Sequence, residues 1–155
     1  MRHAKAAWAN GQQGDHDRPL DAVGQGEAAR VGALLAARGH HPQQVISSDA
    51  VRTRETWAAL ADLLPDTPVT FSTALYLGGL DVVRKAISAQ GDAVDCLLLL
   101  GHNPGLSLAA GWLIGSELEL GTAYACVLRA DADTWTAALR FGGFKLAEIL
   151  TPRTA

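Results

Sequence analysis

Apolar side chains recur along the chain at two different spacings, and these spacings predict alternating helices and strands. Between residues 21 and 38 the apolar positions fall on one face of a helix, with Asp21 as the expected N-cap and Gly39 as the stop. The same spacing is found between residues 50 and 64, where the predicted helix ends before Pro65. Two further helices are predicted over 79–89 and from a start near Pro104.

Short apolar runs between these helices predict strands. The segments QQVIS and VTFS are two of them, and the run VDCLLLL at residues 94–100 is apolar without alternation. An unbroken apolar run of this length is typical of a central parallel strand that is covered on both faces. Beyond residue 123, the stretches AYACVLRA, WTAALRF and FKLAEIL predict further strands that pair antiparallel at an edge of the sheet.

The alternation of strands and helices predicts a layered α/β fold with a largely parallel sheet and an antiparallel edge near the C-terminus. The chain has 155 residues, of which 48% are hydrophobic, and this is enough for a core without metal or disulfide support. The sequence contains no repeat or linker that would divide it. We therefore expect a single domain over residues 1–155.

Net charge and cysteine content argue against several classes of protein. The formal net charge of −3 gives no electrostatic basis for binding nucleic acid or an anionic membrane surface. The longest apolar run is too short to span a bilayer, and the N-terminus has no apolar segment typical of a signal peptide. Cys96 and Cys126 lie in apolar stretches typical of small buried residues in a reducing compartment. These features predict a cytoplasmic protein.

Charged residues with possible chemistry gather where a strand meets a helix. In VISSDAVRTRET the strand ends at Ser47 or Ser48, and either serine is a suitable helix cap. Arg52 follows in the first turn of the helix. Because helical side chains lean toward the N-terminus, Arg52 is expected to point over the carboxyl end of the strand. The alternative is that Arg52 and Arg54 are solvated charges on the helix surface.

A second junction of this kind is LLLLGHNPG, in which the most apolar strand runs into His102. Asn103 is the expected N-cap of the next helix, and Pro104 suits its first position. His102 is thereby expected beside free helix N–H groups at the carboxyl edge of the sheet. Open α/β sheets bind ligands at that edge, and helix N-termini favour anions. The alternative is a turn histidine without a function.

Four motifs in this order, RHAKA, DRPL, SSDAVRTRET and GHNPG, resemble the histidine phosphatase superfamily, and in particular its small SixA-type phosphohistidine phosphatases. The resemblance covers essentially the whole chain. It implies a three-layer α/β/α fold of the phosphoglycerate mutase-like type, in which His3 is the nucleophile that attacks phosphorus. It also implies that Arg2, Arg52 and His102 hold the phosphoryl oxygens. Arg18 is either a further phosphate contact or an ordinary loop residue.

The chemistry of phosphoryl transfer favours these roles independently of the family. Arginine keeps its charge and presents a planar fork, and its charge-assisted hydrogen bonds contribute roughly 1.5–3 kcal/mol each. The nucleophilic imidazole of His3 must be neutral at its attacking nitrogen, and neighbouring guanidinium groups lower its pKa. Because these side chains neutralise the developing charge, we expect neither a metal nor a cofactor.

The sequence departs from the family pattern at three places. The family has an apolar strand before the Arg-His pair, whereas only Met1 precedes it here, so we expect further residues upstream of this numbering. Thr73 and Ala74 stand where larger members carry the acid that protonates an oxygen leaving group. No inserted segment follows DRPL, which predicts a shallow, open pocket. The last two features favour a phosphorylated side chain on a protein, whose basic nitrogen leaving group needs less help from an acid.

These observations favour a metal-independent phosphatase that forms a phosphohistidine intermediate and removes phosphate from phosphohistidine in a protein. A phosphomonoesterase for small phosphorylated molecules and a weakly active phosphate-binding module are the alternatives. The residues Asp15, His16 and Asp17 in GDHDR could suggest a metal site. Neighbouring loop residues rarely form one without distant partners, so we interpret this segment as a solvated loop.

Overall fold

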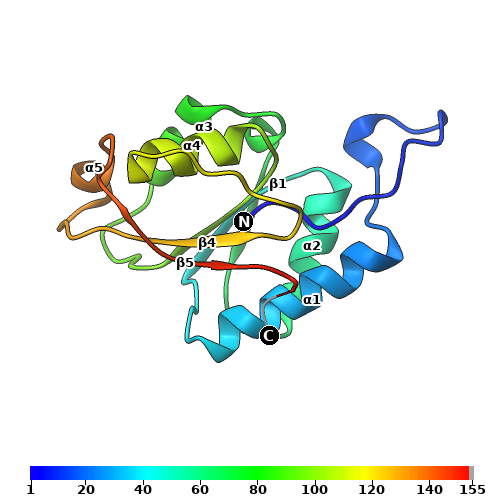
Figure 1. Cartoon of the computed structure of the whole chain (residues 1–155), viewed down its shortest axis with the longest axis horizontal. Coiled ribbons are helices and arrows are strands. Elements are labelled where there is room, and N and C mark those ends of the chain that lie inside the picture. The colour runs from blue at the N-terminus through cyan, green and yellow to red at the C-terminus, as the bar shows by residue number, and fades with distance from the viewer. Residues whose placement is uncertain (154–155) are drawn as a thin grey trace.

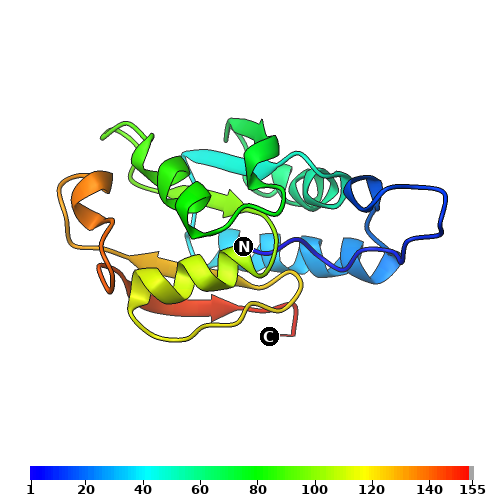
Figure 2. The same ribbon diagram turned by 90° about the horizontal axis from the view of Figure 1, so that it is seen from above.

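Two small sheets with helices on both sides of them build a three-layer α/β/α structure in the computed structural model, which describes residues 1–153 (Figures 1 and 2). The parallel sheet has the strand order β2-β1-β3, and the second sheet is the antiparallel pair β4-β5. This arrangement confirms the predicted α/β fold with its antiparallel C-terminal edge. The strands are β1 (Gln44–Ser48), β2 (Val69–Ser72), β3 (Leu97–Leu100), β4 (Ala125–Arg129) and β5 (Lys145–Leu150).

The first three residues of the chain run between β3 and β4 and join the two sheets (Figure 1). Toward β3, the nitrogen of Met1 donates to the Leu99 carbonyl over 2.7 Å, and the Gly101 amide donates to the Met1 carbonyl over 3.2 Å. Toward β4, the Arg2 amide donates to the Tyr124 carbonyl over 3.0 Å. The N-terminal segment is therefore held by backbone hydrogen bonds on both sides.

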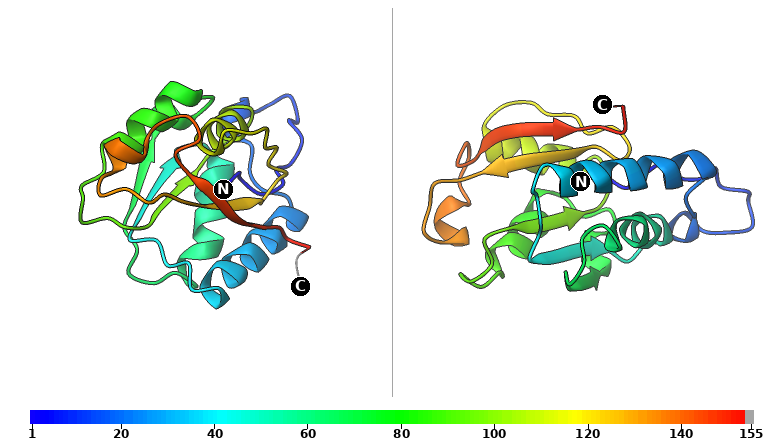
Figure 3. Two further views of the ribbon diagram at one scale, coloured as in Figure 1. Left: turned by 60° about the vertical axis from the view of Figure 1, so that its left-hand side comes forward. Right: turned by 90° about the horizontal axis from the view of Figure 1, so that it is seen from below.

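Helices cover both faces of this framework. Figure 3 shows α1 and α2 side by side on one face, and α3 and α4 lie together on the other. Each pair packs on its own apolar core, one around Val31, Val45, Leu60 and Leu100 and the other around Val83, Leu106 and Leu113. The helices are α1 (Ala22–Ala37), α2 (Val51–Ala61), α3 (Leu80–Ser88), α4 (Gly105–Ile114) and the short α5 (Trp135–Ala138). Within residues 1–153, no helix is long and apolar enough to cross a membrane.

The predicted ends of α1 are correct. The Asp21 carboxylate accepts from the Gly24 amide over 2.7 Å and caps α1, and Gly39 follows this helix with a positive φ of 74°. The cap predictions at the two functional junctions are wrong. Ala50, not Ser47 or Ser48, is the N-cap of α2, and it makes no side-chain cap bond.

Asn103 does not cap α4, which begins at Gly105 with Pro104 in the cap position. The Asn103 amide instead donates to the Leu120 carbonyl over 2.8 Å, and its oxygen accepts from the Ser107 hydroxyl over 2.8 Å. The side chain therefore ties the His102 loop to a distant segment. This tertiary contact competes with local capping and prevails.

The stretch 135–141 was expected to be a strand and instead contains α5 followed by a turn. The Thr134 hydroxyl accepts from the Ala137 amide over 3.1 Å, and this local cap favours a helical turn over the β-like composition. The strand predicted over 94–100 is also shorter than expected. Within the three-stranded sheet β1 is the central strand, and β3 lies between β1 and the N-terminal segment. The leucines of β3 are mostly half-buried rather than fully covered on both faces.

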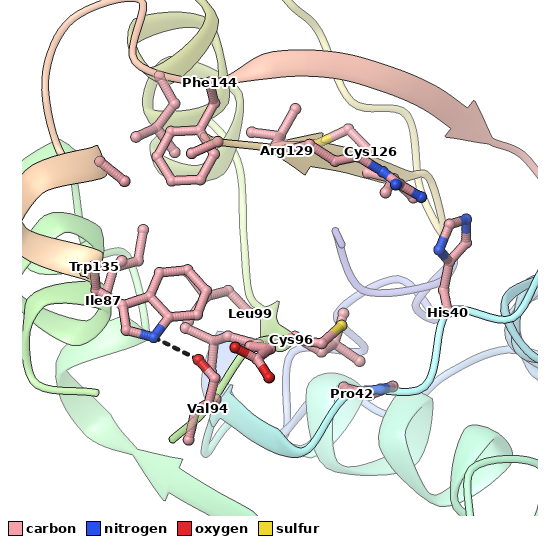
Figure 4. A pocket seen from close by; sticks show the side chains of 18 of the residues that line it. His40, Pro42, Ile87, Val94, Cys96, Leu99, Cys126, Arg129, Trp135 and Phe144 are labelled. Carbon is pink, nitrogen blue, oxygen red and sulfur yellow. Dashed lines mark hydrogen bonds between the residues drawn. The ribbon is translucent and has the colours of Figure 1, made fainter. Parts of the chain in front are cut away.

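A cavity of about 600 Å³ lies between β3 and β4 (Figure 4), and Met1 is among the residues that line it. Its walls are largely apolar and include Leu99, Cys126 and Phe144. Trp135 lies at one side, where its indole nitrogen donates to the Val94 carbonyl over 2.8 Å. None of the residues that we predicted to bind phosphate lines this cavity, so it is separate from the candidate site.

Gly24 and Gly26 of α1 provide a matched test of how closely this helix approaches the N-terminal segment. A Cβ at Gly24 would lie 2.0 Å from the Lys5 carbonyl oxygen, whereas a Cβ at Gly26 would meet nothing within 4 Å. We expect Gly26→Ala to raise the free energy of unfolding by about 0.5–1 kcal/mol, the usual gain in helix propensity. Gly24→Ala should lower it by about 1–3 kcal/mol, because backbone atoms must move. Urea denaturation measures both values, and equal effects at the two positions would contradict this packing.

Candidate active site

His3 stands where the N-terminal segment leaves the two sheets. Its amide donates to the Gly101 carbonyl and its carbonyl accepts from the Ala123 amide, each over 3.0 Å. The ring nitrogen Nδ1 lies 2.7 Å from the Ala4 carbonyl oxygen, which can only accept, so Nδ1 carries the proton. The lone pair is therefore on Nε2. Burial, with a further contribution from the Arg52 charge, lowers the pKa of His3 to about 4.

His102 lies two residues after the end of β3 and is only 4% exposed. Its ring centroid lies 5.1 Å from that of His3, and its Nε2 lies 2.8 Å from the Ser48 hydroxyl oxygen. Its Nδ1 is buried and has no hydrogen-bond partner among residues 1–153. Burial and the neighbouring His3 ring lower the pKa of His102 to about 3. The structure thus brings two uncharged imidazoles together at the carboxyl end of the parallel sheet.

Arg52 lies in the first turn of α2, and its side chain is 5% exposed. The Arg52 charge contributes to lowering the pKa of both His3 and His102, as expected for a guanidinium group near the carboxyl end of β1. Its Nη1 donates to the Asp15 carbonyl over 2.5 Å, and its Nη2 lies 3.0 Å from the Asp15 carboxylate. The alternative of a solvated helix charge is therefore wrong for Arg52.

Two further arginines approach the same region from different sides. Arg2 donates through Nη1 to the Leu120 carbonyl over 3.0 Å, and its buried Nε has no partner in the described part of the chain. Arg18 donates through Nε to the Ala7 carbonyl over 2.8 Å and through Nη1 to Asp15 over 2.9 Å. Both charges contribute to lowering the pKa of His3, whose burial is the larger cause. Arg18 joins the site through Asp15 rather than by direct contact with an imidazole.

The GDHDR segment, which we interpreted as a solvated loop, forms one side of the site. The Asp15 carboxylate accepts from Arg52, from Arg18 and, over 2.7 Å, from the Tyr76 hydroxyl. Hydrogen bonds from Tyr76 and Arg18 hold the pKa of Asp15 well below its usual range. The only signal for this in the sequence was the spacing of Asp15 and Arg18, which the short helix η1 (Asp15–Asp17) turns into an ion pair.

Next to Asp15, a second pair of charged groups forms the rim of the site. His16 Nε2 lies 2.9 Å from the Asp49 carboxylate, which also accepts from the Thr73 hydroxyl over 2.8 Å. The hydrogen bond to Asp49 raises the pKa of His16. The Tyr76 ring lies between the two histidine environments, 4.8 Å from the His16 ring and 5.4 Å from the His102 ring. Sequence reasoning missed Tyr76, because no local pattern marks it.

Comparison with known proteins decides the family. The sequence model of the histidine phosphatase superfamily (branch 1) matches residues 1–76 of this chain. A chloroplastic protein of Arabidopsis thaliana is 33% identical over 165 residues, which cover 98% of this chain and 76% of that protein. A protein of Mycobacterium tuberculosis is 39% identical over 110 residues, which cover 71% of this chain and 67% of that protein. This chain belongs to the histidine phosphatase superfamily.

Solved structures place the chain in the SixA-type branch of this superfamily. The candidate phosphohistidine phosphatase SixA of Agrobacterium tumefaciens superposes with a TM-score of 0.86 at 28% identity, covering 98% of this chain and 95% of that one. The corresponding protein of Nakamurella multipartitia gives 0.83 at 27% identity, covering 99% and 94%. The chain is accordingly a phosphatase with the phosphoglycerate mutase-like fold, and it acts on phosphorylated substrates.

This histidine phosphatase has no group of three or more His, Cys, Asp or Glu side chains that could hold a metal ion, as far as residues 1–153 describe it. Asp15 is engaged by two arginines and a tyrosine, and His16 by Asp49. Asp15 thus balances the two arginine cations of the site.

The protonation states of the imidazoles can be tested without measuring activity. Because burial lowers the pKa of His3 to about 4 and that of His102 to about 3, neither ring should titrate between about pH 8 and pH 5. The midpoint of His16 should lie above the ordinary value of about 6.5, because Asp49 stabilises its charged form. Imidazole NMR shifts, assigned with single His→Gln variants, measure these midpoints. A midpoint near 6.5 for His3 would contradict the description of the site.

Proposed function

We propose that this histidine phosphatase removes phosphate from phosphohistidine in a protein, without a metal, by way of a phosphorylated His3. The observation that carries the proposal is the His3–His102 pair, with ring centroids 5.1 Å apart beside the guanidinium group of Arg52. His3 serves as the nucleophile, and His102 and Arg52 bind the phosphoryl oxygens. A phosphorylated protein in the cytoplasm is the partner that we infer.

The state of His3 suits a nucleophile. With a pKa of about 4 the ring is neutral near pH 7, and the Ala4 carbonyl holds the proton on Nδ1. Nε2 attacks phosphorus as the bond from phosphorus to the leaving nitrogen breaks. The electron pair of that bond stays on the leaving nitrogen, and the other nitrogen of the substrate imidazole carries a proton, so the leaving group departs as neutral imidazole. Water then attacks phosphorus, the bond from phosphorus to Nε2 breaks with its electron pair returning to Nε2, and the protons of the water leave with inorganic phosphate, so His3 is again neutral with its proton on Nδ1.

We assign the binding of the phosphoryl oxygens to Arg52, Arg2 and His102. Arginines are suited to this task because their charge and planar geometry match phosphoryl oxygens. His102 is held through Nε2 by Ser48, and its Nδ1 is the buried atom without a partner. A bound phosphoryl dianion raises the pKa of His102, because it favours the charged imidazole, and Nδ1 then donates to an oxygen. Arg18 contributes charge from the other side of Asp15.

The surroundings of Thr73 favour a nitrogen leaving group. Thr73 and Ala74 occupy the region where an acid was sought, and the Thr73 hydroxyl already donates to Asp49 over 2.8 Å. A phosphorylated imidazole releases a basic nitrogen, which needs less assistance from an acid than the oxygen of a phosphate ester. This difference is what favours phosphohistidine over a small phosphate ester as substrate.

A small-molecule phosphomonoesterase is the second candidate. A mycobacterial glucosyl-3-phosphoglycerate phosphatase superposes with a TM-score of 0.67, covering 94% of each chain, but its 17% identity shows a shared fold alone. The weakly active phosphate-binding module is the third candidate, and it would require the arginines but not His3.

Replacing the nucleophile separates an enzyme from a binding module. His3→Ala should lower kcat by at least about 10²–10⁴-fold, because it removes the covalent route, while phosphate affinity should change far less. The wild type should trap radioactive phosphate on an acid-labile, base-stable site that the variant lacks. Turnover is measured on phosphoramidate and on a phosphohistidine protein in excess EDTA, where wild-type activity should persist.

Arg52→Ala is the comparison variant for this experiment. A donor used in both the ground state and the transition state should weaken phosphate binding and turnover together. Undiminished turnover in His3→Ala, together with no trapped phosphate in the wild type, would overturn the phosphatase mechanism. Loss of activity in EDTA that is restored by added metal would overturn its metal independence.

The choice of substrate is tested by comparing leaving groups on the same enzyme. We expect kcat/KM for a phosphohistidine protein to exceed that for alkyl phosphate esters by about 10²-fold or more, the usual contribution of one positioned proton donor. Initial rates of phosphate release over a range of substrate concentrations give both constants. Higher kcat/KM values for small esters would favour the small-molecule phosphomonoesterase instead.

A further inference from the structure

The guanidinium group of Arg52 is hydrogen-bonded to another residue of the protein, Asp15. Its two terminal nitrogens are both bonded to Asp15, Nη1 to the backbone carbonyl over 2.5 Å and Nη2 to the carboxylate over 3.0 Å. The Arg52 side chain is 5% exposed, whereas that of Asp15 is 49% exposed. A cation buried to this degree needs an anionic partner, and Asp15 supplies it.

The same carboxylate is held from three directions. Oδ1 accepts from Arg18 over 2.9 Å, and Oδ2 accepts from Arg52 over 3.0 Å and from the Tyr76 hydroxyl over 2.7 Å. Its position is therefore fixed by three side chains from different parts of the fold. Arg18 follows η1, Arg52 belongs to α2, and Tyr76 follows the short helix η2 (Thr73–Leu75). Two of these three donors are arginines near the phosphoryl-binding groups, so Asp15 and a bound phosphoryl group act on the same cations.

We propose that Asp15 is a positioning residue that orients Arg52 and Arg18 for the phosphoryl group and limits how tightly the site retains inorganic phosphate. The inference rests on the proposed function, because phosphate is the product of that reaction. A carboxylate that shares its arginines with an anionic product repels the product while it keeps the arginines in one geometry. The site thereby gives up anion affinity and gains orientation and product release.

Tyr76 is the third side chain that donates a hydrogen bond to the Asp15 carboxylate. Its hydroxyl fixes the Asp15 carboxylate, and its ring is 5.4 Å from the His102 ring and 5.7 Å from the Arg52 guanidinium carbon. Removing this hydroxyl loosens the carboxylate but leaves its charge in place. Tyr76→Phe therefore separates the positioning effect of Asp15 from its electrostatic effect.

The experiment compares Asp15→Asn with Asp17→Asn in the full chain. Both variants lose one negative charge from the same short helix, but among residues 1–153 the side chain of Asp17 forms an ion pair with His16 alone, at 3.5 Å. Binding of inorganic phosphate is measured by isothermal titration calorimetry, and kcat is measured on phosphoramidate. We expect Asp15→Asn to bind phosphate about 10-fold more tightly and to turn over about 10-fold more slowly, while Asp17→Asn stays within about 2-fold of the wild type in both.

Tyr76→Phe should lower kcat with an unchanged phosphate affinity, and it keeps the test decisive if Asp15→Asn fails to fold. Unchanged or weaker phosphate binding in Asp15→Asn, or equal effects of Asp15→Asn and Asp17→Asn, would overturn the inference. A Tyr76→Phe variant with wild-type kcat would overturn the positioning role. These outcomes are distinct from failure of the proposed function, which would appear as a wild type that forms no phosphorylated His3.

Discussion

Backbone hydrogen bonds on both sides of the first three residues are the constraint on which the site depends. The His3 amide and carbonyl are bonded to Gly101 and Ala123, which belong to the chain segments after β3 and before β4. His102 is the next residue after Gly101, so one junction fixes the positions of both imidazoles. The 5.1 Å separation of the two rings is therefore a property of the sheet framework rather than of flexible side chains.

Charge in the site is balanced by protein side chains that the fold brings together. The buried imidazole of His102 and the half-buried imidazole of His3 stay neutral because desolvation and neighbouring arginines disfavour their charged forms. The buried Arg52 cation is compensated by Asp15, which comes from a different part of the fold. A region that collects this much positive potential is suited to a dianion and poorly suited to a cation. The same balance accounts for the three donors, Arg18, Arg52 and Tyr76, that hold the Asp15 carboxylate.

The sequence made the junction residues predictable because local rules place them. Arg52 and His102 each lie where a strand ends and a helix begins, so residues close to them in the sequence are enough to predict their place. The order of the four motifs indicated the family. Asp15 could not be found in this way, because its partners Arg52 and Tyr76 lie 37 and 61 residues away. The false strand over 135–141 has the opposite cause, since one threonine hydroxyl outweighed the apolar composition of a whole stretch.

The position of Met1 has a practical consequence for anyone who attaches other sequences to this protein. Its nitrogen lies inside the fold, bonded to the Leu99 carbonyl, and burial lowers the pKa of this amino group. A peptide fused to that nitrogen has to enter the apolar cavity between β3 and β4 before it can reach solvent. Any chain that continues from this nitrogen therefore has to suit an apolar environment, which favours an extended apolar segment between β3 and β4 and disfavours a charged one.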